Sequence, residues 1–574
     1  MLKEELINNC FNEISKVEDV FLVDSIPTKT RSYYVECWKV HTCISVSSMA
    51  EKIELYIGFT SAFPYECPEV YYFDTKYDYI PHIDYFSRKL CLFEDGSTYS
   101  PNEPVALLHN CIKKAKQLIE IGAKRENKDD FIQELHSYWD SKYPGESYVD
   151  EDWLFYGDFP NNSQILNVWS YYELLSTEEG QYHHIIVPTD NIENGFKEYI
   201  RKKPGFEDSE VLYLNSVEIP DTPPYSITPM VLENMIRDIE DLKLLKKELE
   251  KKRYIKIAFR LQKTNYIGGV VIPFQSEKRK GFRKLSAYDE LTRFEKRNKC
   301  LQRFSGKIYS LSRISQRTVG NAIEARKVAV AGLGSIGSNL CFFLNGWTNT
   351  GFLLVDKENI QPENIGRHIH GVKYIHQSKV YAMEEYLREK RPDIFIKSFY
   401  DSIERVIEKN IEEFNSCSML FLCMGDCMSE QYVMSLVKNR MLVVPIMILW
   451  LEPFAIAGHL VYINPANNPN IDGLLNRDTM LYKHNLIKES EYIKKGSTEF
   501  VSRDAGCNGA YALYSGNDVI LFLSAMYSII DDKINKPTNS MCYRWVGNIN
   551  NAKERNISLI EGEHIKGSVI EIPI

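Results

Sequence analysis

Apolar side chains near the amino terminus recur first at helical and then at strand spacing. Residues Leu2 to Val17 place apolar positions three or four apart, which predicts a helix. Segments rich in Val, Tyr, Phe and Ile follow, and helical spacing returns from Pro104 to about Gly122. The pattern predicts an α+β unit that begins and ends with a helix. Its four strands, expected to form an antiparallel meander, are Val20 to Ile26, Tyr33 to Val46, Lys52 to Thr60 and Glu69 to Phe73.

The middle of the chain is less regular. An acidic, polar stretch from Glu126 to Asp152 indicates a connection. Beyond it, strands such as His184 to Pro188 and Tyr254 to Leu261 occur with a long charged helix from Thr228 to Lys252. Because this region contains no chemical motif, we expect a mixed α/β domain that links or docks.

From Arg326 the order changes to apolar strand, glycine turn, amphipathic helix and apolar strand. This order is typical of a parallel sheet with crossover helices. The run from Met441 to Leu451 is too short to span a membrane and predicts a buried strand. The sequence therefore predicts a multidomain α+β and α/β protein with domains at 1–145, 146–305 and 306–574.

Composition narrows the functional classes. The chain has 574 residues, of which 44 % are hydrophobic and 26 % charged, as in ordinary globular proteins with several domains. A net charge of -9 gives no general attraction to nucleic acid. The amino terminus lacks the pattern of a signal peptide, and the 13 cysteines have neither regular spacing nor a CxxC pair. We expect a cytoplasmic protein with free thiols that binds neither membrane nor nucleic acid.

A glycine-rich turn provides the first candidate site. Gly332, Gly334 and Gly337 lie between a predicted strand and a predicted helix, where glycines let backbone amides approach a phosphate. The next strand ends at Asp356, which is placed to bind ribose hydroxyls. At this point a dehydrogenase that uses NAD, or a glycine turn without a ligand, remains open.

The residues after Asp356 favour a nucleotide triphosphate. Asn364, Arg367 and Lys379 supply an amide and two cations, and Asp426 closes a later strand. Charge that develops on phosphate oxygens needs such donors, and a carboxylate can hold Mg²⁺. ATP with Mg²⁺ is therefore the cofactor prediction.

This part of the chain resembles the ubiquitin-activating enzymes and their bacterial relatives in thiamine and molybdopterin biosynthesis. The resemblance rests on GLGSIG, VDKENIQPENIGRH, QSK, CMGD and the strand pair RMLVVPIMILW and AIAGHLVYINP. It implies a Rossmann-like adenylation domain that attaches AMP to a C-terminal carboxylate. It further implies that Asp356 binds ribose, that Asn364, Arg367 and Lys379 bind phosphates, and that Asp426 binds magnesium. The family often adds an arginine from a partner subunit, for which Arg303, Arg313 and Arg317 are unranked candidates.

Cys507 is the candidate nucleophile that would turn the adenylate into a thioester. It stands between small residues in a polar segment, and Arg503 nearby could favour the thiolate. The alternative is a buried structural thiol, which we expect of Cys341, Cys417 and Cys423 in apolar runs.

The amino-terminal unit resembles a ubiquitin-conjugating enzyme over about residues 1 to 125. The matching order is helix, four-stranded meander, proline turns, the cysteine of KLCLF, the YSP segment and a closing helix. Cys91 takes the position of the thioester-forming cysteine. Where eukaryotic members carry His-Pro-Asn, this chain has Pro81-His82-Ile-Asp84, which leaves the oxyanion donor open. The candidates for a base that helps the attacking lysine are Asp84, Glu94 and Asp95.

Both units on one chain resemble the fusion proteins of bacterial CBASS anti-phage operons. The resemblance implies that the C-terminus of a cGAS-like nucleotidyltransferase (CD-NTase) is adenylated, captured on Cys507, transferred to Cys91 and joined to a target lysine. It also implies a homodimer. The alternatives are a sulfur-carrier adenylyltransferase, another bacterial ubiquitin-like conjugation system and a scaffold without activity.

Overall fold

The structure is a computed structural model of the full chain, and it divides into two compact units. The first unit comprises Met1–Thr189 and Glu207–Ile308, and the second comprises Asp190–Phe206 and Tyr309–Ile574. The structure describes residues 3–28, 33–46, 49–77, 80–84, 86–93, 99–126, 128–133, 135–140, 148–174, 180–189, 194–218, 227–251, 255–261, 267–272, 291, 300–320, 325–346, 350–467, 469–495, 498–503 and 510–574.

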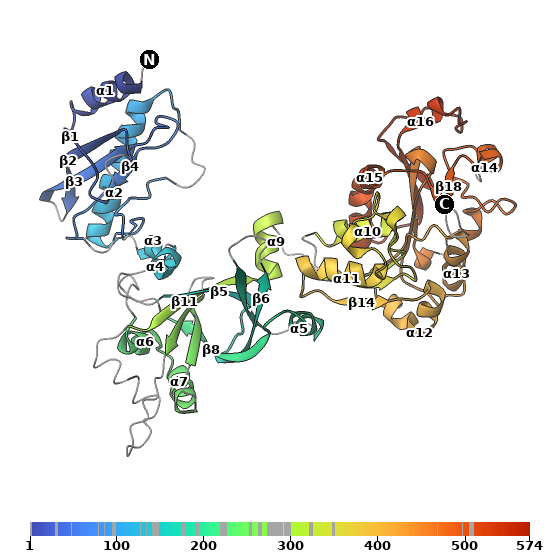
Figure 1. Ribbon diagram of the computed structural model, residues 1–574, viewed down its shortest axis with the longest axis horizontal. Coiled ribbons are helices and arrows are strands. Elements are labelled where there is room, and N and C mark those ends of the chain that lie inside the picture. Colours follow the sequence, from blue (N-terminus) through green and yellow to red (C-terminus); the bar gives the residue numbers. More distant parts are fainter. Residues whose placement is uncertain are drawn as a thin grey trace. The chain divides into compact units, whose positions relative to one another are not determined.

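The amino-terminal part is a four-stranded antiparallel meander with a helix at each end of its sequence (Figure 1). The predicted order is confirmed. Trp38, Leu55 and Phe59 are fully buried in the sheet, and Leu108 and Ile112 of the closing helix complete the same core. The elements are α1 (Lys3–Ile14), β1 (Asp19–Val23), β2 (Glu36–Val46), β3 (Met49–Phe59), β4 (Glu69–Tyr71) and α2 (Pro104–Lys124).

The acidic stretch after α2 is more than the predicted connection. It contains two short helices, α3 (Lys128–Gln133) and α4 (Leu135–Asp140). Leu135, Tyr138 and Trp139 are buried because their spacing of three and four places them on one face of α4. The Trp139 indole also donates a hydrogen bond to the carbonyl oxygen of Phe304, at 2.8 Å. This face therefore forms part of the core of the following barrel.

Seven strands close into a barrel in the order β10-β11-β5-β7-β6-β8-β9. Glycines admit aromatic rings into its walls: a Cβ atom on Gly269 would lie 2.1 Å from the Phe304 ring. The strands are β5 (Tyr148–Tyr156), β6 (Gln164–Leu174), β7 (Gln181–Pro188), β8 (Glu207–Val217), β9 (Ile255–Leu261), β10 (Ile267–Ile272) and β11 (Gln302–Tyr309).

The long helix predicted over Thr228 to Lys252 is wrong, because the structure has two helices there. These are α6 (Pro229–Met235) and α7 (Ile239–Lys251). Asp238 separates them, since its carboxylate accepts hydrogen bonds from the backbone N–H groups of Glu240 and Asp241 at 2.7 and 3.3 Å. A side chain that satisfies the free donors of a helix start defines a new helix at that point.

The carboxyl-terminal unit is a three-layer α/β structure around an eight-stranded sheet of order β14-β13-β12-β15-β16-β17-β20-β21. The strands from β14 to β16 are parallel and the others antiparallel, which confirms the predicted parallel-rich sheet. Helices α10, α11 and α15 cover one face, and α12 and α13 cover the other (Figure 1). The sheet strands are β12 (Arg326–Ala331), β13 (Thr350–Val355), β14 (Ile396–Phe399), β15 (Met419–Leu422), β16 (Ile446–Leu451), β17 (Ala457–Ile463), β20 (Met541–Val546) and β21 (Val569–Pro573).

The remaining elements of this unit include an insertion from the barrel. Helix α5, between β7 and β8, belongs to the carboxyl-terminal unit, where Gly195 lies against Arg388 of α11. None of the helices in the described ranges is long and apolar enough to cross a membrane. The helices are α5 (Asn194–Arg201), α9 (Leu311–Val319), α10 (Ser335–Leu344), α11 (Lys379–Lys390), α12 (Ile403–Asn415), α13 (Cys427–Lys438), α14 (Glu489–Lys495), α15 (Gly516–Asn535) and α16 (Ile549–Glu554), and a separate hairpin pairs β18 (Val501–Arg503) with β19 (Ala510–Ala512). Short 3₁₀ helices span Pro362–Asn364, Val372–Tyr374, Pro453–Ala455, Pro465–Asn467 and Ile471–Gly473.

Candidate functional site

The glycine turn joins β12 to α10, as predicted, and its three glycines differ in what requires them. Gly332 has a φ of 87°, and a Cβ atom there would lie 2.7 Å from the backbone nitrogen of Met424. A Cβ atom on Gly337 would lie 1.8 Å from the carbonyl oxygen of Gly332. Backbone packing therefore requires both. Gly334, by contrast, precedes α10 with open space beside it, so the helix amino terminus can face a phosphate.

Asp356 follows β13 and holds the glycine turn in place. One carboxylate oxygen accepts a hydrogen bond from the Leu333 N–H at 2.7 Å, and the other accepts one from the Glu358 N–H at 2.8 Å. Burial raises the pKa of this carboxyl group above its usual value. The residue thus shapes the turn in addition to its predicted contact with ribose.

His368 holds the same turn from the other side, a role that the sequence did not reveal. Its Nε2 lies 2.6 Å from the Leu333 carbonyl oxygen, and its Nδ1 accepts the backbone N–H of His370 at 3.2 Å. Burial lowers the pKa of His368 to about 3, so the ring is neutral and Nε2 carries the proton. Its place directly after Arg367 in the GRH motif is the one signal in the sequence.

Lys379 begins α11 with a buried ammonium group. Its Nζ forms an ion pair with Glu358 at 2.6 Å, and the Glu358 carboxylate is itself largely exposed. A buried cation whose partner is exposed to solvent can exchange that partner for a phosphate oxygen. The predicted role of Lys379 fits this geometry.

Asp426 lies at the carboxyl end of β15 and caps α13. Its two oxygens accept hydrogen bonds from the Met428 N–H at 3.1 Å and the Ser429 hydroxyl at 3.0 Å. The same hydroxyl also contacts Glu404, which follows β14. Burial acts to raise the pKa of Glu404, but hydrogen bonds, chiefly the one from Ser429, act more strongly to lower it. The pKa is therefore below its usual value, and the carboxyl group is ionised.

Glu404 is a candidate that the sequence analysis missed. The carboxyl ends of parallel strands meet at one edge of a sheet, so the acidic segment after β14 shares this edge with the segments after β13 and β15. That order was a usable signal. Two carboxylates with oxygen donors suit Mg²⁺, which takes one or two protein carboxylates together with phosphates and water. No group of three or more His, Cys, Asp or Glu side chains that could hold a metal exists among the described residues.

The glycine turn, Lys379 and the carboxylates that follow the parallel strands line one cavity of about 190 Å³. The cavity brings together five of the predicted nucleotide-site residues, and Glu404 joins them. Those five are Gly332, Gly334, Asp356, Lys379 and Asp426.

Three other predicted residues do not line this cavity, although they lie nearby in the fold. Gly337 packs within the turn. The Asn364 side-chain oxygen accepts the Gln361 N–H at 2.9 Å, which caps a 3₁₀ turn. The Arg367 guanidinium donates to the Ala512 carbonyl oxygen at 2.7 Å and lies over the Tyr514 ring. In this arrangement Arg367 joins the nucleotide motif to β19.

The three candidates for an arginine supplied by a partner subunit differ in their exposure to solvent. Arg303 is buried in β11, where it donates to the Tyr138 carbonyl oxygen at 3.4 Å and lies near the Trp139 ring. A buried barrel residue cannot reach another subunit. Arg313 and Arg317 lie one turn apart on the exposed face of α9.

Cys507 lies outside the described residues. The strands on either side of its segment, β18 and β19, pair antiparallel from Val501 opposite Ala512 to Arg503 opposite Ala510. Arg367 contacts the carbonyl of Ala512, so this hairpin is attached to the nucleotide motif. Cys341, Cys417 and Cys423 are buried, as predicted, and burial raises the pKa of each thiol.

Cys91 is an exposed thiol in the amino-terminal part of the chain. The residues before it run beside β4: the Leu90 N–H donates to the Val70 carbonyl oxygen at 2.8 Å, and Leu90 pairs with Ile83. Lys89 adds an ion pair with Glu69 at 2.6 Å. An ordered segment therefore presents an accessible sulfur, as a transfer site requires.

The residues upstream of Cys91 form a tight turn. His82 has a φ of 60°, and its carbonyl oxygen accepts the Cys91 N–H at 2.7 Å. The Asp84 carboxylate accepts the N–H and the hydroxyl of Ser87, each at 2.6 Å. Asp84 thus stabilises the turn, while Glu94 and Asp95, the other candidates for a base, lie outside the described residues.

Lys114 on α2 contacts the other side of the Cys91 segment. Its ammonium group donates to the Leu92 carbonyl oxygen at 3.2 Å and lies 4.1 Å from the centre of the Phe93 ring. The Cys91 sulfur in turn lies 3.7 Å from the Phe93 carbonyl oxygen. No feature of the sequence indicated this contact, because a lysine on a charged helix face is ordinary.

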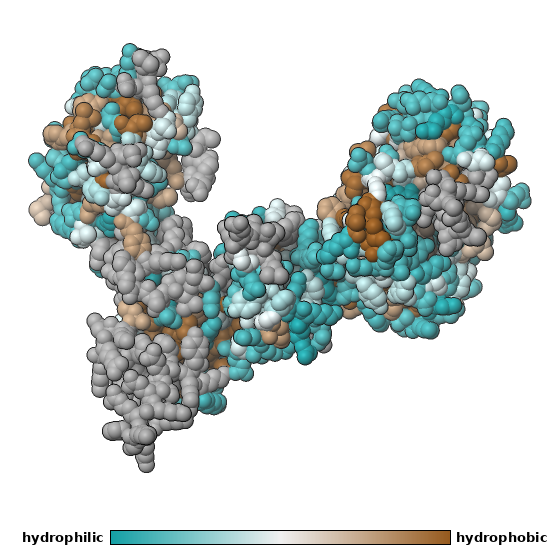
Figure 2. Space-filling view, in the orientation of Figure 1, coloured by the Kyte–Doolittle hydropathy of each residue, from teal (hydrophilic) through white to brown (hydrophobic). Residues whose placement is uncertain are grey.

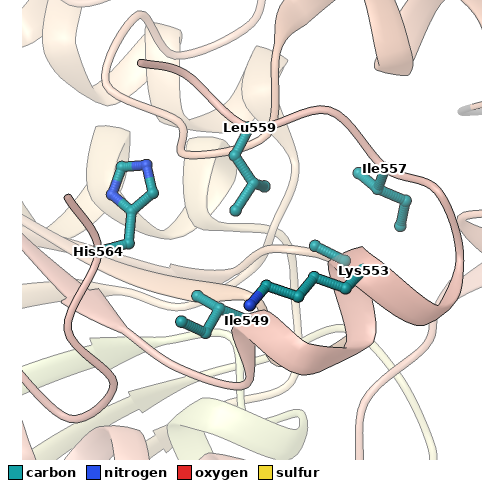
Figure 3. A pocket seen from close by; sticks show the side chains of 6 residues that line it. Ile549, Lys553, Ile557, Leu559 and His564 are labelled. Carbon is teal, nitrogen blue, oxygen red and sulfur yellow. The ribbon is translucent and has the colours of Figure 1, made fainter. Parts of the chain in front are cut away.

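A second cavity, of about 290 Å³, lies beside α16 and contains none of the predicted nucleotide-site residues (Figure 3). Ile549, Ile557 and Leu559 give it apolar walls, and Lys553 and His564 supply its polar atoms. The His564 Nε2 lies 3.0 Å from the Ile560 carbonyl oxygen. The smaller cavity is the candidate chemical site, since it holds the carboxylates, the lysine and the glycine turn.

Two family models match separate parts of the chain. A family model described as Prokaryotic E2 family B matches residues 26–147, and one described as ThiF family matches residues 307–527. No curated protein sequence matches the chain.

Two solved structures are similar over 60 % of the chain. The crystal structure of selenomethionine PaaA is 12 % identical, is covered over 95 % of its own length and gives a TM-score of 0.33. The crystal structure of E. coli MccB with succinimide is 10 % identical, is covered over 81 % and gives a TM-score of 0.32.

The E2 match contains Cys91, and the ThiF match contains the complete cavity with its glycine turn. The chain therefore combines a prokaryotic E2 domain with a ThiF family domain, and it is an ATP-dependent enzyme of ubiquitin-like activation and conjugation.

Proposed function

We propose that the enzyme joins the C-terminus of a partner protein to a lysine through two successive thioesters, on Cys507 and then on Cys91. The observation that carries this proposal is the exposed Cys91 in an ordered segment, on the same chain as the nucleotide cavity. A sulfur-carrier adenylyltransferase needs the cavity but has no use for an E2 domain. The E2 match therefore favours conjugation.

The first step is adenylation in the ThiF domain. A carboxylate oxygen of the partner attacks the α-phosphorus of ATP, and the bond to pyrophosphate breaks. The α10 amino terminus and Lys379 stabilise the phosphate charge, and Asp356 holds the turn that positions the nucleotide. Asp426 and Glu404 would hold Mg²⁺, which would supply positive charge to offset the phosphate charge.

The next two steps transfer the acyl group from the phosphate of AMP to the Cys507 sulfur and then to the Cys91 sulfur. The Cys507 thiolate attacks the acyl carbon, and AMP leaves. The Cys91 thiolate attacks the resulting thioester, and the Cys507 thiolate leaves. A neutral lysine amine then attacks the Cys91 thioester, loses its proton and releases the thiolate as an isopeptide bond forms.

The partner, the pathway and the compartment belong to the same proposal. The resemblance to CBASS fusion proteins favours a cGAS-like nucleotidyltransferase as the protein whose C-terminus is conjugated, in anti-phage defence. The cysteines within the described residues form no disulfide, which suits a reducing cytoplasm.

We also propose that the ThiF domains pair as a homodimer. Phe342 of α10 and Ile520 and Leu521 of α15 are 40, 37 and 57 % exposed. Figure 2 shows apolar side chains gathered over the face that α10 and α15 form. An exposed apolar patch on two packed helices is a typical protein interface.

A thioester assay with three variants tests the proposed route. The protein is incubated with ATP, Mg²⁺ and a labelled cGAS-like nucleotidyltransferase, and adducts are resolved with and without reductant. Cys91→Ala should retain a reducible adduct on Cys507, and Cys507→Ala should lose every adduct but still exchange pyrophosphate into ATP. Asp426→Ala should lose both the exchange and the adducts.

Two outcomes separate the parts of the proposal. A reducible adduct on Cys91 in the Cys507→Ala variant would overturn the proposed order. Adducts that form with other proteins of a cell lysate, but not with the nucleotidyltransferase, would reject that partner and retain the relay.

A further inference from the structure

Two cysteines of the E2 domain, apart from Cys91, lie in contact with each other. The sulfur atoms of Cys67 and Cys111 are 3.9 Å apart. Cys67 precedes β4, and Cys111 lies in the middle of α2, so the contact joins two segments that are distant in sequence. The conjugation chemistry uses neither thiol.

The two thiols differ in access and in acidity. Cys67 is half-buried and Cys111 is buried. The hydrogen bond from Cys111 lowers the pKa of Cys67, and the Lys114 ammonium lowers it further, although burial opposes both. The same contact, together with burial, raises the pKa of Cys111. Cys67 is thus the thiol that a small oxidant can reach and that ionises more readily.

We propose that Cys67 and Cys111 form a dithiol that a peroxide oxidises to a disulfide, and that this disulfide slows transfer from Cys91. The Cys67 thiolate attacks one peroxide oxygen, the O–O bond breaks, and Cys67 becomes a sulfenic acid with release of water. The Cys111 sulfur then attacks the Cys67 sulfur, the S–O bond breaks, and a second water leaves. Two thiols lose two electrons and two protons, and one peroxide becomes two waters.

Helix α2 links this pair to the active cysteine. Lys114 follows Cys111 by three residues and contacts Leu92 and Phe93, directly after Cys91. A disulfide requires the sulfurs to approach from 3.9 Å to about 2.05 Å. The proposal takes part of this approach to come from the turn of α2 that carries Cys111 and Lys114, so that Lys114 moves relative to the Cys91 segment. This regulatory consequence rests on the proposed transfer from Cys91.

The chemical part is tested by peptide mapping of the full chain. The protein is treated with hydrogen peroxide, remaining thiols are alkylated, and the non-reduced digest is analysed by mass spectrometry. We expect a peptide pair linked through Cys67 and Cys111. Cys111→Ser should instead trap a sulfenic acid on Cys67, detected as a dimedone adduct, and Cys67→Ser should give neither product. The exposed Cys43 provides the control, since Cys43→Ser should leave the linked pair unchanged.

The regulatory part is tested by the rate at which charged Cys91 transfers to lysine. Oxidation should slow transfer per charged Cys91 by about fivefold or more in the unmodified protein. Oxidation should have little effect on this rate in Cys67→Ser. That variant is the control for direct oxidation of Cys91, which should occur to the same extent in both proteins. Dithiothreitol should restore the rate, and melting curves of Cys67→Ser should show an intact fold.

Three results would contradict the inference, and a fourth concerns a different proposal. The inference fails if no linked pair forms, if dimedone marks Cys91 but never Cys67, or if the linked protein transfers at the unoxidised rate. An absence of any Cys91 thioester in the reduced protein would refute the proposed conjugation route instead. The peptide map would still test the Cys67–Cys111 disulfide, because disulfide formation does not require that thioester.

Discussion

His368 is a buried imidazole whose two ring nitrogens both bind backbone groups. It contacts the carbonyl of Leu333, while Asp356 accepts the N–H of the same residue. Leu333, within the glycine turn, is thereby held through both its backbone N–H and its backbone carbonyl. The two contacts of the His368 ring depend on its protonation state. Only a neutral ring with its proton on Nε2 can donate to the Leu333 carbonyl and also accept the His370 N–H.

Acid should weaken this arrangement through His368. Its folded pKa of about 3 lies below the ordinary value of 6.5, so the folded protein binds fewer protons than the unfolded chain between these values. The stabilisation is present above pH 6.5 and is lost as the pH falls toward 3. At a pH one unit below the ordinary value, the loss is about 1.4 kcal/mol.

The matched variant is His368→Gln, which keeps an N–H donor toward Leu333 but cannot titrate. Melting temperatures of the variant should fall less between neutral pH and pH about 5.5 than those of the unmodified protein. His370, whose pKa burial lowers to about 4, is present in both proteins and cancels in the comparison. Equal losses in the two proteins would contradict the assignment.

At the residue scale, the sequence predicted the groups whose chemistry has a fixed spacing. Gly332, Gly334 and Asp356 were found because a strand, a turn and a helix impose the distance between them. His368 and Lys114 escaped because their partners are backbone carbonyls brought near by tertiary packing. A single sequence carries no spacing rule for such contacts.

The loop that follows β16 depends on another buried side chain, Glu452. Its carboxylate accepts hydrogen bonds from His459, from the backbone N–H groups of Leu486 and Ile487, and from the Tyr492 hydroxyl. Burial raises the pKa of that hydroxyl, so it remains a donor. Four donors on two oxygens attach the segment before α14 to the sheet.

Removal of this acceptor should destabilise the ThiF domain. In Glu452→Ala the buried donors lose their partner, at a cost of about 1 to 3 kcal/mol for each one left unsatisfied. We therefore expect a melting temperature several degrees lower, with Glu452→Gln intermediate because it keeps one acceptor oxygen. The exposed Glu499→Gln is the control, and it should melt like the unmodified protein.

The milder substitution, Glu452→Gln, should affect formation of the thioester more than formation of the adenylate. The Tyr492 ring meets the Phe500 ring edge-on at 5.4 Å, and Phe500 immediately precedes β18, which leads to the Cys507 segment. Glu452→Gln should thus reduce thioester formation on Cys507 more than pyrophosphate exchange. Equal reductions would show that this loop has no specific part in positioning the hairpin.

At the element scale, periodicity predicted the meander and the parallel strands but not every boundary. The helix over Thr228 to Lys252 divides because the Asp238 carboxylate competes for backbone donors. The polar stretch before β5 hides a buried face at Leu135, Tyr138 and Trp139, whose apolar positions are diluted by charged neighbours. A cap or a short apolar face depends on local contacts, and average composition does not report them.

At the scale of the whole molecule, the candidate chemical groups lie in the two family domains, and the barrel shows no chemical motif in its sequence and no candidate site among its described residues. The insertion Asp190–Phe206 leaves the barrel and packs with the ThiF domain, through Gly195 against Arg388. A continuous chain thus contributes to both units more than once. Sequence order alone could not predict this, because the insertion carries no motif.

Pairing of ThiF domains should depend on the patch formed by α10 and α15. In a two-fold dimer the same patch occurs twice, so one substitution removes two contacts. Leu521→Glu deletes two apolar side chains, each worth about 1.5 to 3 kcal/mol when buried, and brings two carboxylates into the interface. Sedimentation velocity should show a dimer for the unmodified protein and a monomer for Leu521→Glu at the same concentration.

The control substitution is Ile565→Glu, which changes a side chain that is 62 % exposed outside the patch. It should leave the dimer intact, and neither variant should lose melting temperature through core packing, because both residues face solvent in the single chain. A monomeric unmodified protein, or a dimer that survives Leu521→Glu, would contradict the proposed interface. If dimerisation and pyrophosphate exchange fall together in Leu521→Glu, the second subunit contributes to the nucleotide cavity; Arg313 and Arg317 on the exposed face of α9 are then the groups to substitute next.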